Sequence, residues 1–261
     1  MRASKAARLR AYYEGEFFEF ESTRGYLDDI FTSSRLKAVW EALPPGPYRR
    51  PWLDVGCGFG YGLARLHSLH ASPCVGVDIS MRFLEAARSI ACGGCSLCQA
   101  DILSLPFDSG VFQGVLALEV IEHALDVSAA IDELCRVSGD FLFLSFPTDH
   151  DWLYSKLGIV LNPYVGLSFE DALHDHVGHI SVPTLHFVVE RLSRNGFAIE
   201  QLKSLYSVVP PPFKLGFHYP DVKRIWQILY RWFVAVDHWL GRFPPLRGRG
   251  LSVVVVARRS V

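Results

Sequence analysis

The sequence lacks an apolar segment long enough to cross a lipid bilayer. Its purely apolar runs reach only five residues, as in 253–257, whereas a transmembrane helix needs about 20. Residues 1–20 hold four basic and three acidic side chains with no apolar stretch between them, so no secretory signal peptide is expected. We therefore expect a cytoplasmic protein, with peripheral membrane contact as the one exception considered below.

The sequence also lacks an excess of positive charge. It contains 26 basic and 27 acidic residues, for a formal net charge of −1. Proteins that bind nucleic acid through its phosphates usually carry a clear positive excess. Nucleic acid is therefore not an expected partner.

Cysteine is scarce, with six in the chain. Without a secretion signal, we interpret them as reduced thiols. The spacing of Cys92, Cys95 and Cys98 is similar to that of iron–sulfur or zinc ligands. A fourth ligand is missing nearby, and the segment has to join a helix to a strand. We therefore interpret these three as small apolar side chains beside a glycine turn and expect no metal there.

The chain does contain a regular alternation of short apolar strands and amphipathic helices. This pattern predicts βαβ units and an α/β fold, a Rossmann-like doubly wound and mostly parallel sheet of about seven strands. The expected strands are 52–55, 74–77, 97–100, 111–118, 141–146, 197–205 and 251–257, and the expected helices are 60–69, 81–91, 128–137 and 183–194. We expect residues 1–261 to form a single domain, with an N-terminal helical cap over 1–48 and substrate-side insertions at 148–182 and 208–249.

Three glycines at alternate positions follow the first strand. The segment reads Asp54-Val55-Gly56-Cys57-Gly58-Phe59-Gly60. Glycine permits a tight turn and lets the backbone approach a ligand closely. The helix that follows directs unpaired N–H groups towards a carboxylate or phosphate. Such a loop could bind NAD, FAD or SAM (S-adenosylmethionine), or could be a plain structural turn.

Two acidic residues narrow these choices. Asp78 ends the second strand, about 20 residues beyond the loop, where a carboxylate can hold the hydroxyls of a ribose. Asp101 ends the third strand and could accept a hydrogen bond from an adenine amino group. A single aspartate at such a place is more often a turn cap, but three ligand-side features in series favour a nucleoside site.

The fourth strand ends in Leu118-Glu119-Val120-Ile121-Glu122-His123. Together with 54–60, Asp78, Asp101 and 105–107, this ending resembles the class I SAM-dependent methyltransferase superfamily. The likeness is greatest to its small-molecule branch, which includes the ubiquinone and menaquinone methyltransferases. It covers residues 50–147 strongly and 179–200 more weakly, and Gln113 stands where that family usually has an aspartate.

The resemblance implies S-adenosylmethionine as cofactor, an antiparallel last strand and a role for each matched residue. The glycines Gly56, Gly58 and Gly60, in the loop with Asp54 and Cys57, would line the methionine and ribose portion. Asp78 would hold the ribose hydroxyls, Ile79 would pack on adenine, Asp101 and the backbone of Ile102 would contact its amino group, and Leu118 and Glu119 would lie near the methionine amino end.

Methyl transfer to a hydroxyl acceptor also needs a base, and histidine suits that task near neutral pH. His123 follows the fourth strand on the ligand side of the sheet, and His179 belongs to a cluster with His174 and His176. We predict that His123 and His179 are catalytic, although His123 could simply cap a loop. The spacing of the three clustered histidines is not a strong zinc pattern, so we expect no metal there either.

The sequence therefore predicts a SAM-dependent methyltransferase of a small-molecule or lipid-like acceptor, with O-methylation favoured. A protein or RNA methyltransferase is the main alternative, and a nicotinamide-linked oxidoreductase is a weaker one. A non-catalytic protein with the same fold is also possible on sequence grounds.

The insertion 208–249 contains a predicted helix over 222–240. Lys223, Gln227 and Arg231 recur every four residues, and most of the rest is apolar or aromatic. One interpretation is a helix buried against its own domain or against a second copy in a homodimer. The other is a lid that rests on a membrane surface through 222–249, with tryptophans at the interface and arginines towards anionic head groups.

Overall fold

The computed structural model describes most of the chain. The described residues are 2–15, 17–19, 30–46, 48–69, 73–91, 94–148, 179–205, 224–241, 243 and 250–260. The predicted histidines His174 and His176, together with Cys92 and most of both predicted insertions, lie outside these residues.

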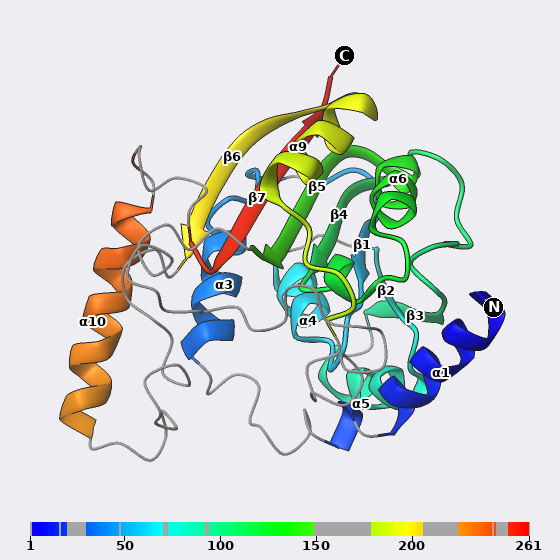
Figure 1. The fold of residues 1–261 in the computed structure, drawn as a ribbon, viewed down its shortest axis with the longest axis horizontal. Helices are drawn as coiled ribbons and strands as arrows, with labels where there is room; N and C mark the ends of the chain where they lie inside the picture. Colours follow the sequence, from blue (N-terminus) through cyan, green and yellow to red (C-terminus); the bar gives the residue numbers. More distant parts are fainter. Residues whose placement is uncertain are drawn as a thin grey trace.

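A seven-stranded sheet forms the centre of the fold (Figure 1). Its strands are β1 (Trp52–Val55), β2 (Cys74–Asp78), β3 (Cys95–Gln99), β4 (Phe112–Leu118), β5 (Ser138–Pro147), β6 (Phe197–Leu205) and β7 (Ser252–Arg259). The order is β3-β2-β1-β4-β5-β7-β6, and β7 runs antiparallel to both of its neighbours. The predicted fold class is thereby confirmed, including the antiparallel last strand.

The third strand begins earlier than the sequence pattern indicated. Its parallel register with β2 pairs Cys74 with Cys95 and Asp78 with Gln99, so the predicted strand 97–100 is wrong by about two residues at its start. The apolar pattern was weak there because β3 is the edge strand of the sheet and its residues are only partly buried.

Helices cover both faces of the sheet. They are α1 (Arg2–Glu14), α3 (Ile30–Trp40), α4 (Tyr61–Ser68), α5 (Met81–Ile90), α6 (Val127–Val137), α9 (Leu185–Arg194) and α10 (Arg224–Leu240), with a short 3-10 helix η1 (Ile121–His123). The side chains of Ser80, Asp126 and Thr184 cap α5, α6 and α9 by accepting backbone N–H bonds. These polar caps are the local reason that each helix begins where it does.

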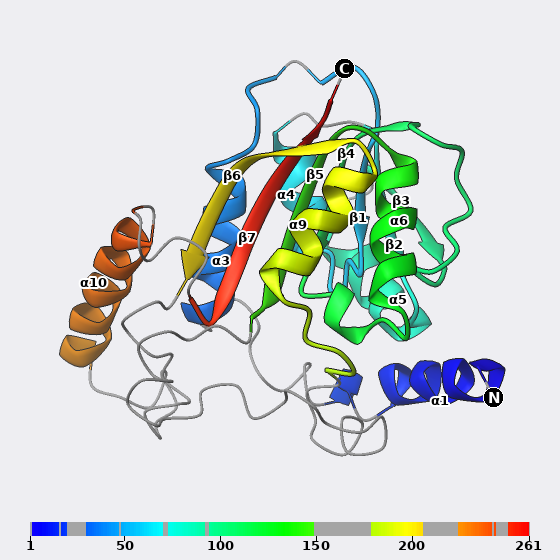
Figure 2. The ribbon, with the colours of Figure 1, turned by 45° about the horizontal axis from the view of Figure 1, so that its top comes forward.

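The strand β1 illustrates why the sheet has two cores. Its residues alternate between faces, and all four are buried. Trp52 packs in a cluster with residues of α3, α4 and α5, whereas Leu53 and Val55 pack in a second cluster with residues of α6 and α9. The two helix layers, with α6 and α9 in front of the sheet in Figure 2, make this a doubly wound α/β fold.

Gln113 joins the chain that enters β1 to β4. Its side-chain oxygen accepts the backbone N–H groups of Arg49 (2.8 Å) and Arg50 (3.2 Å). An amide oxygen is a competent acceptor for two donors, so the chain entering β1 stays tied to β4.

The helix α10 lies beside the edge strand β6, at the end of the sheet opposite β3 (Figures 1 and 2). Tyr230 and Val234 face the domain and are buried, whereas Ile228, Trp232 and Trp239 are each more than half exposed. The predicted helix is confirmed from Arg224 onwards. None of the helices in the described part of the chain combines the length and apolar character that a membrane span requires.

The expectation that all six cysteines are reduced is wrong for one pair. Cys74 and Cys95 form a disulfide between β2 and β3, with their Cα atoms 4.9 Å apart. The parallel register that places these two residues opposite each other brings their Cα atoms within the usual range for a disulfide. Cys57, Cys98 and Cys135 are free thiols.

Candidate functional site

The glycine loop lies at the carboxyl end of β1 and has a left-handed backbone. Gly56, Gly58 and Gly60 have φ values of 67°, 50° and 84°, a region that side chains with a Cβ rarely adopt. A Cβ on Gly56 would lie 2.4 Å from Cγ2 of Val120, so the loop is pressed against the segment that follows β4. At Gly58, in contrast, no atom of the described residues lies within 4 Å of the Cβ position. A ligand can therefore approach the backbone of Gly58.

Asp78 at the end of β2 faces this loop. Its carboxylate accepts the backbone N–H of Gly58 on one oxygen and that of Ser80 on the other, each at 2.9 Å. The residue is only 7% exposed, and burial raises the pKa of Asp78 to about 6.

A second buried carboxylate, that of Asp54, lies close enough to Asp78 to be affected by its charge. Asp54 is in β1, and its carboxylate lies against Gly62 in the first turn of α4. Burial, followed by the charge of Asp78, raises the pKa of Asp54 to about 7. Two buried carboxylates with raised pKa values are stabilised in their charged form by a ligand that donates hydrogen bonds or carries positive charge.

Asp101 lies beyond the end of β3, one strand away from Asp78. Its side chain accepts the backbone N–H of Leu103 at 3.0 Å, as expected of a turn cap. This contact uses one oxygen and leaves acceptor capacity on the carboxylate. Ile102 packs against the core cluster that includes residues of α6 and α9. Ile79 packs with tyrosines of α1.

The N-terminal helix α1 contributes residues for which the sequence gives no local signal. Glu14 accepts the backbone N–H of Met81 at 2.7 Å and that of Arg82 at 3.3 Å, so it caps the start of α5. Tyr13 is buried, and its hydroxyl makes no hydrogen bond within the described part of the chain. Burial raises the pKa of Tyr13, as do the charges of Tyr12, Glu122 and Asp78.

The end of β4 holds a strained, charged residue. Glu119 has a φ of 57°, which is uncommon for a residue other than glycine, asparagine or aspartate. Its carboxylate lies 3.2 Å from Nη1 of the buried Arg35 and accepts the hydroxyl of Ser252 at 3.3 Å. Strain of this kind persists only where surrounding contacts hold it, and these contacts come from α3 and the start of β7.

Glu122, His123 and His179 form a cluster next to Glu119. Oε1 of Glu122 lies 4.0 Å from Nε2 of His123 and 3.9 Å from Nε2 of His179. The two imidazole rings are 5.0 Å apart between centroids. The backbone carbonyl of Glu122 accepts N–H bonds from Ile180 and Ser181, which is how the segment after residue 178 is held against η1.

Burial sets the charge states in this cluster. Glu122 is fully buried, and burial and the nearby Glu119 raise its pKa. Burial, together with the positive charges of His123 and Arg35, lowers the pKa of His179. His179 is therefore neutral near neutral pH and can accept a proton.

The geometry thus joins two groups of predicted residues. The glycine loop, Asp54 and Asp78 form one group, and Glu119, His123 and His179 form the other, with the contact between Gly56 and Val120 linking them. Glu122 was in the motif but had no predicted role. Tyr13, Glu14 and Arg35 had no local signal, because only the tertiary packing of α1 and α3 brings them to the site.

Comparison with known proteins agrees with this arrangement. Residues 53–140 match the methyltransferase domain family. An O-methyltransferase of Penicillium expansum is 34% identical over 90 residues, which is 33% of each chain. The chloroplastic tocopherol O-methyltransferase of Arabidopsis thaliana is 36% identical over 92 residues, covering 33% of this chain and 26% of that protein. The chain thus spans about a third or less of the length of these relatives.

The likeness in structure extends much further along the chain. A SAM-dependent methyltransferase from Mesorhizobium loti has a TM-score of 0.59 at 21% identity, and the match covers 87% of this chain and 98% of that one. The strand order, the left-handed glycine loop, the family match over 53–140 and this fold agree with one another. Residues 53–140 therefore match the methyltransferase domain family, and the chain has the fold of the solved SAM-dependent methyltransferase.

Proposed function

We propose that this protein transfers a methyl group from SAM to a small-molecule or lipid-like acceptor, with an oxygen atom as the favoured site. The observation that carries the proposal is the buried carboxylate of Asp78, held by the N–H groups of Gly58 and Ser80, at the same end of the parallel strands as the cluster of Glu122, His123 and His179. A nucleoside site next to a candidate base is the arrangement that methylation of a hydroxyl requires.

The residues present fit this cofactor. Asp78 would accept hydrogen bonds from the ribose hydroxyls, and the open backbone of Gly58 would allow close approach. Ile79, Asp101 and Ile102 would surround the adenine, and Leu118 and Glu119 would lie near the methionine end. SAM, when bound, supplies a methyl group already activated on a sulfonium sulfur, so the protein mainly has to position the acceptor and exclude water.

The two histidines supply the proton acceptor in this proposal. His179, neutral because its pKa is lowered, would take the proton of an acceptor hydroxyl, either directly or through His123. Glu122 would orient both rings through the one oxygen that faces their Nε2 atoms. Relatives that match this chain include an N-methyltransferase, so amine acceptors belong in the test as well.

Calorimetric titration with SAM, S-adenosylhomocysteine and NAD tests the cofactor. We expect binding of the first two and none of NAD. A panel of phenols, quinols and amines, assayed by release of S-adenosylhomocysteine, then tests the acceptor class. Tight NAD binding without SAM binding would favour a nicotinamide-linked oxidoreductase, and transfer to protein or RNA alone would favour the other alternative.

The pH dependence of SAM binding is a specific consequence. Ribose hydroxyls favour the ionised form of Asp78, so binding lowers its pKa below the value of about 6 in the free protein. Affinity is therefore expected to rise with pH and level off above about pH 7, and to be about tenfold weaker at pH 5 than on the plateau. Calorimetry across this range checks the prediction, and an Asp78→Asn variant should lose most of the dependence. An affinity that rises as pH falls would contradict it.

The exposed face of α10 bears on where the acceptor comes from. Large exposed apolar side chains concentrate there, at Ile228, Leu229, Trp232, Phe233 and Trp239, with Phe243 just beyond. Apolar patches of this kind are usually covered by a partner or a membrane. We propose that a cytoplasmic form of this protein contacts anionic membranes through this face, which would give it access to a lipid-like acceptor.

Co-sedimentation with vesicles containing phosphatidylserine tests this contact. Wild-type protein is expected to sediment with the vesicles, and a Trp232→Glu, Phe233→Glu variant to remain in solution. An Arg65→Glu variant, changed on the surface of α4, serves as a control. Vesicle binding by neither protein, with a change from dimer to monomer in the double variant, would instead assign the face to a homodimer interface.

A further inference from the structure

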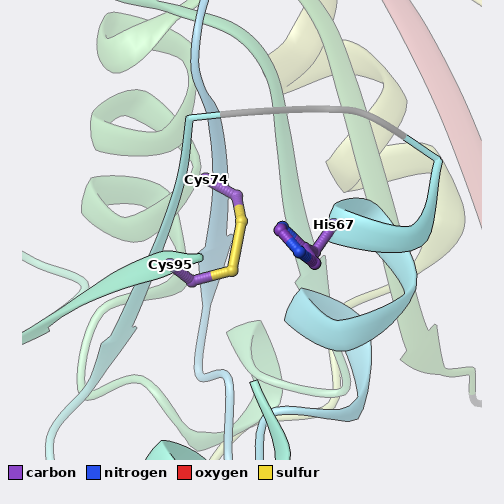
Figure 3. A group of neighbouring side chains, drawn as sticks. All are labelled: His67, Cys74 and Cys95. Carbon is purple, nitrogen blue, oxygen red and sulfur yellow. A yellow bond between two sulfur atoms is a disulfide. The ribbon is translucent and has the colours of Figure 1, made fainter. Parts of the chain in front are cut away.

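A cluster of residues that can bind a metal lies at the amino ends of the strands, whereas the glycine loop lies at their carboxyl ends. His67, in the last turn of α4, faces Cys74 at the start of β2 and Cys95 at the start of β3 (Figure 3). One potential ligand atom from each of the three residues lies within 4.8 Å of the other two. Two thiolates and an imidazole are a typical ligand set for zinc.

We propose that His67, Cys74 and Cys95 bind a zinc ion when the Cys74–Cys95 disulfide is reduced. In the disulfide form both sulfurs are bonded to each other and cannot act as thiolate ligands. A metal ion that binds residues of β2, β3 and α4 would then replace the covalent link between β2 and β3. This inference is independent of the proposed methyl transfer.

Glycine at position 94 leaves room for the imidazole. A Cβ on Gly94 would lie 2.2 Å from Cε1 and 2.4 Å from Nδ1 of His67, so any larger residue would displace the ring. Nδ1 of His67 is buried and makes no hydrogen bond within the described residues. A buried ring nitrogen without a hydrogen-bond partner is unfavourable. A metal ion bound to that nitrogen would supply a partner and remove this cost.

To bind zinc, the two sulfurs must separate and the three ligand atoms must surround the ion. Tetrahedral zinc, with bonds of about 2.3 Å to sulfur and 2.0–2.1 Å to nitrogen, separates its ligand atoms by about 3.5–3.8 Å. The three ligand atoms already lie within 4.8 Å of one another, and the register of β2 and β3 holds the two cysteine Cα atoms 4.9 Å apart. Solvent would complete the coordination.

The reduction step balances with a dithiol as the reductant. A thiolate of the dithiol attacks one sulfur of the disulfide, and its second thiol resolves the mixed disulfide, so two electrons and two protons pass to Cys74 and Cys95. The two cysteine thiols then lose their protons as zinc binds. Cys95 is only partly buried and lies in the edge strand β3, which leaves it accessible to the reductant.

The spacing of Cys92, Cys95 and Cys98 in the sequence gives no indication of this site. Cys98 packs against the opposite core cluster from Cys95, since alternate residues of a strand face opposite sides. The missing ligands come instead from β2 and α4, which are brought to Cys95 only by the fold.

Cobalt titration of the protein tests the proposal. Protein reduced with a phosphine and then freed of it is expected to bind one Co²⁺ with a thiolate-to-cobalt charge-transfer band, and Zn²⁺ should displace it. The oxidised protein should show no such band. A Cys98→Ser variant is the matched control, because it makes the same chemical change on the same strand but the other face, and it should bind like the wild type.

Two variants make the outcome decisive. Cys95→Ser and His67→Gln are each expected to weaken zinc binding by about 100-fold or more, and zinc should raise the melting temperature of the reduced wild type but not of these variants. His67→Gln keeps the disulfide, so its folding can be verified in the oxidised form. Equal zinc binding by reduced wild type and His67→Gln, or by oxidised and reduced wild type, would overturn the proposal.

Discussion

Replacing Asp78 with alanine is expected to weaken SAM binding by about ten- to a hundredfold, the loss of charge-assisted hydrogen bonds worth about 1.5–3 kcal/mol. The carboxylate is buried and held by N–H groups of Gly58 and Ser80, so its acceptor oxygens are already oriented towards the loop. A ligand hydroxyl therefore meets a strong acceptor that is already in position, so that binding does not have to order the carboxylate. Calorimetric titration of the variant with SAM measures the effect.

The variant also removes two contacts that shape the loop, so controls are needed. Asp78→Asn keeps the side-chain shape and one acceptor oxygen, and should lose less affinity than the alanine variant. Asp140→Ala serves as the distant control. Asp140 lies near the start of β5, at the opposite end of the strands from Asp78, and its partly exposed carboxylate pairs with Arg50. This variant should bind SAM like the wild type. Unchanged affinity in a folded Asp78→Ala protein would contradict the assigned role.

Most of the sheet could be predicted from the sequence because its strands are strongly apolar and its helices amphipathic. Ser138–Pro147 and Ser252–Arg259 are both interior strands of the sheet, in agreement with their continuous apolar runs. The edge strand β3 was misplaced, since an edge carries little apolar signal. The glycine loop was equally predictable, because a left-handed backbone at three alternate positions needs glycine.

The parts of the site that arise from tertiary contacts could not be predicted. Tyr13 and Glu14 approach the start of α5 only because α1 packs there, and no spacing in the sequence encodes that docking. Arg35 reaches Glu119 from another helix in the same way. The disulfide was missed for a related reason, because the register between two parallel strands determines which cysteines face each other.

The second large effect concerns turnover. If the acceptor is a hydroxyl, His179→Ala is expected to lower kcat by about 10²- to 10⁴-fold, the range typical of a lost general base. SAM affinity should stay within about threefold of the wild type, because the predicted cofactor contacts lie in the loop and at Asp78. Steady-state kinetics with an acceptor from the panel, combined with SAM titration, separate the two quantities.

The three residues of the cluster should behave as a unit. Both histidines face the same oxygen of Glu122, at 4.0 Å and 3.9 Å, so removing either one disturbs the orientation of the other. The double variant His123→Ala, His179→Ala is therefore expected to lose little more activity than the more damaged single variant. Glu122→Gln, which keeps the shape but replaces the carboxyl group with an amide, should give an intermediate loss of kcat.

A histidine elsewhere provides the matched control. His186 is exposed on α9, and His186→Ala should keep both kcat and SAM affinity.

An amine acceptor offers a second internal comparison, because a neutral amine needs no base before it attacks. Methylation of an amine should therefore survive His179→Ala far better than methylation of a phenol. Full activity towards a phenol in both His123→Ala and His179→Ala would mean that the cluster only positions the acceptor, or that another group takes the proton.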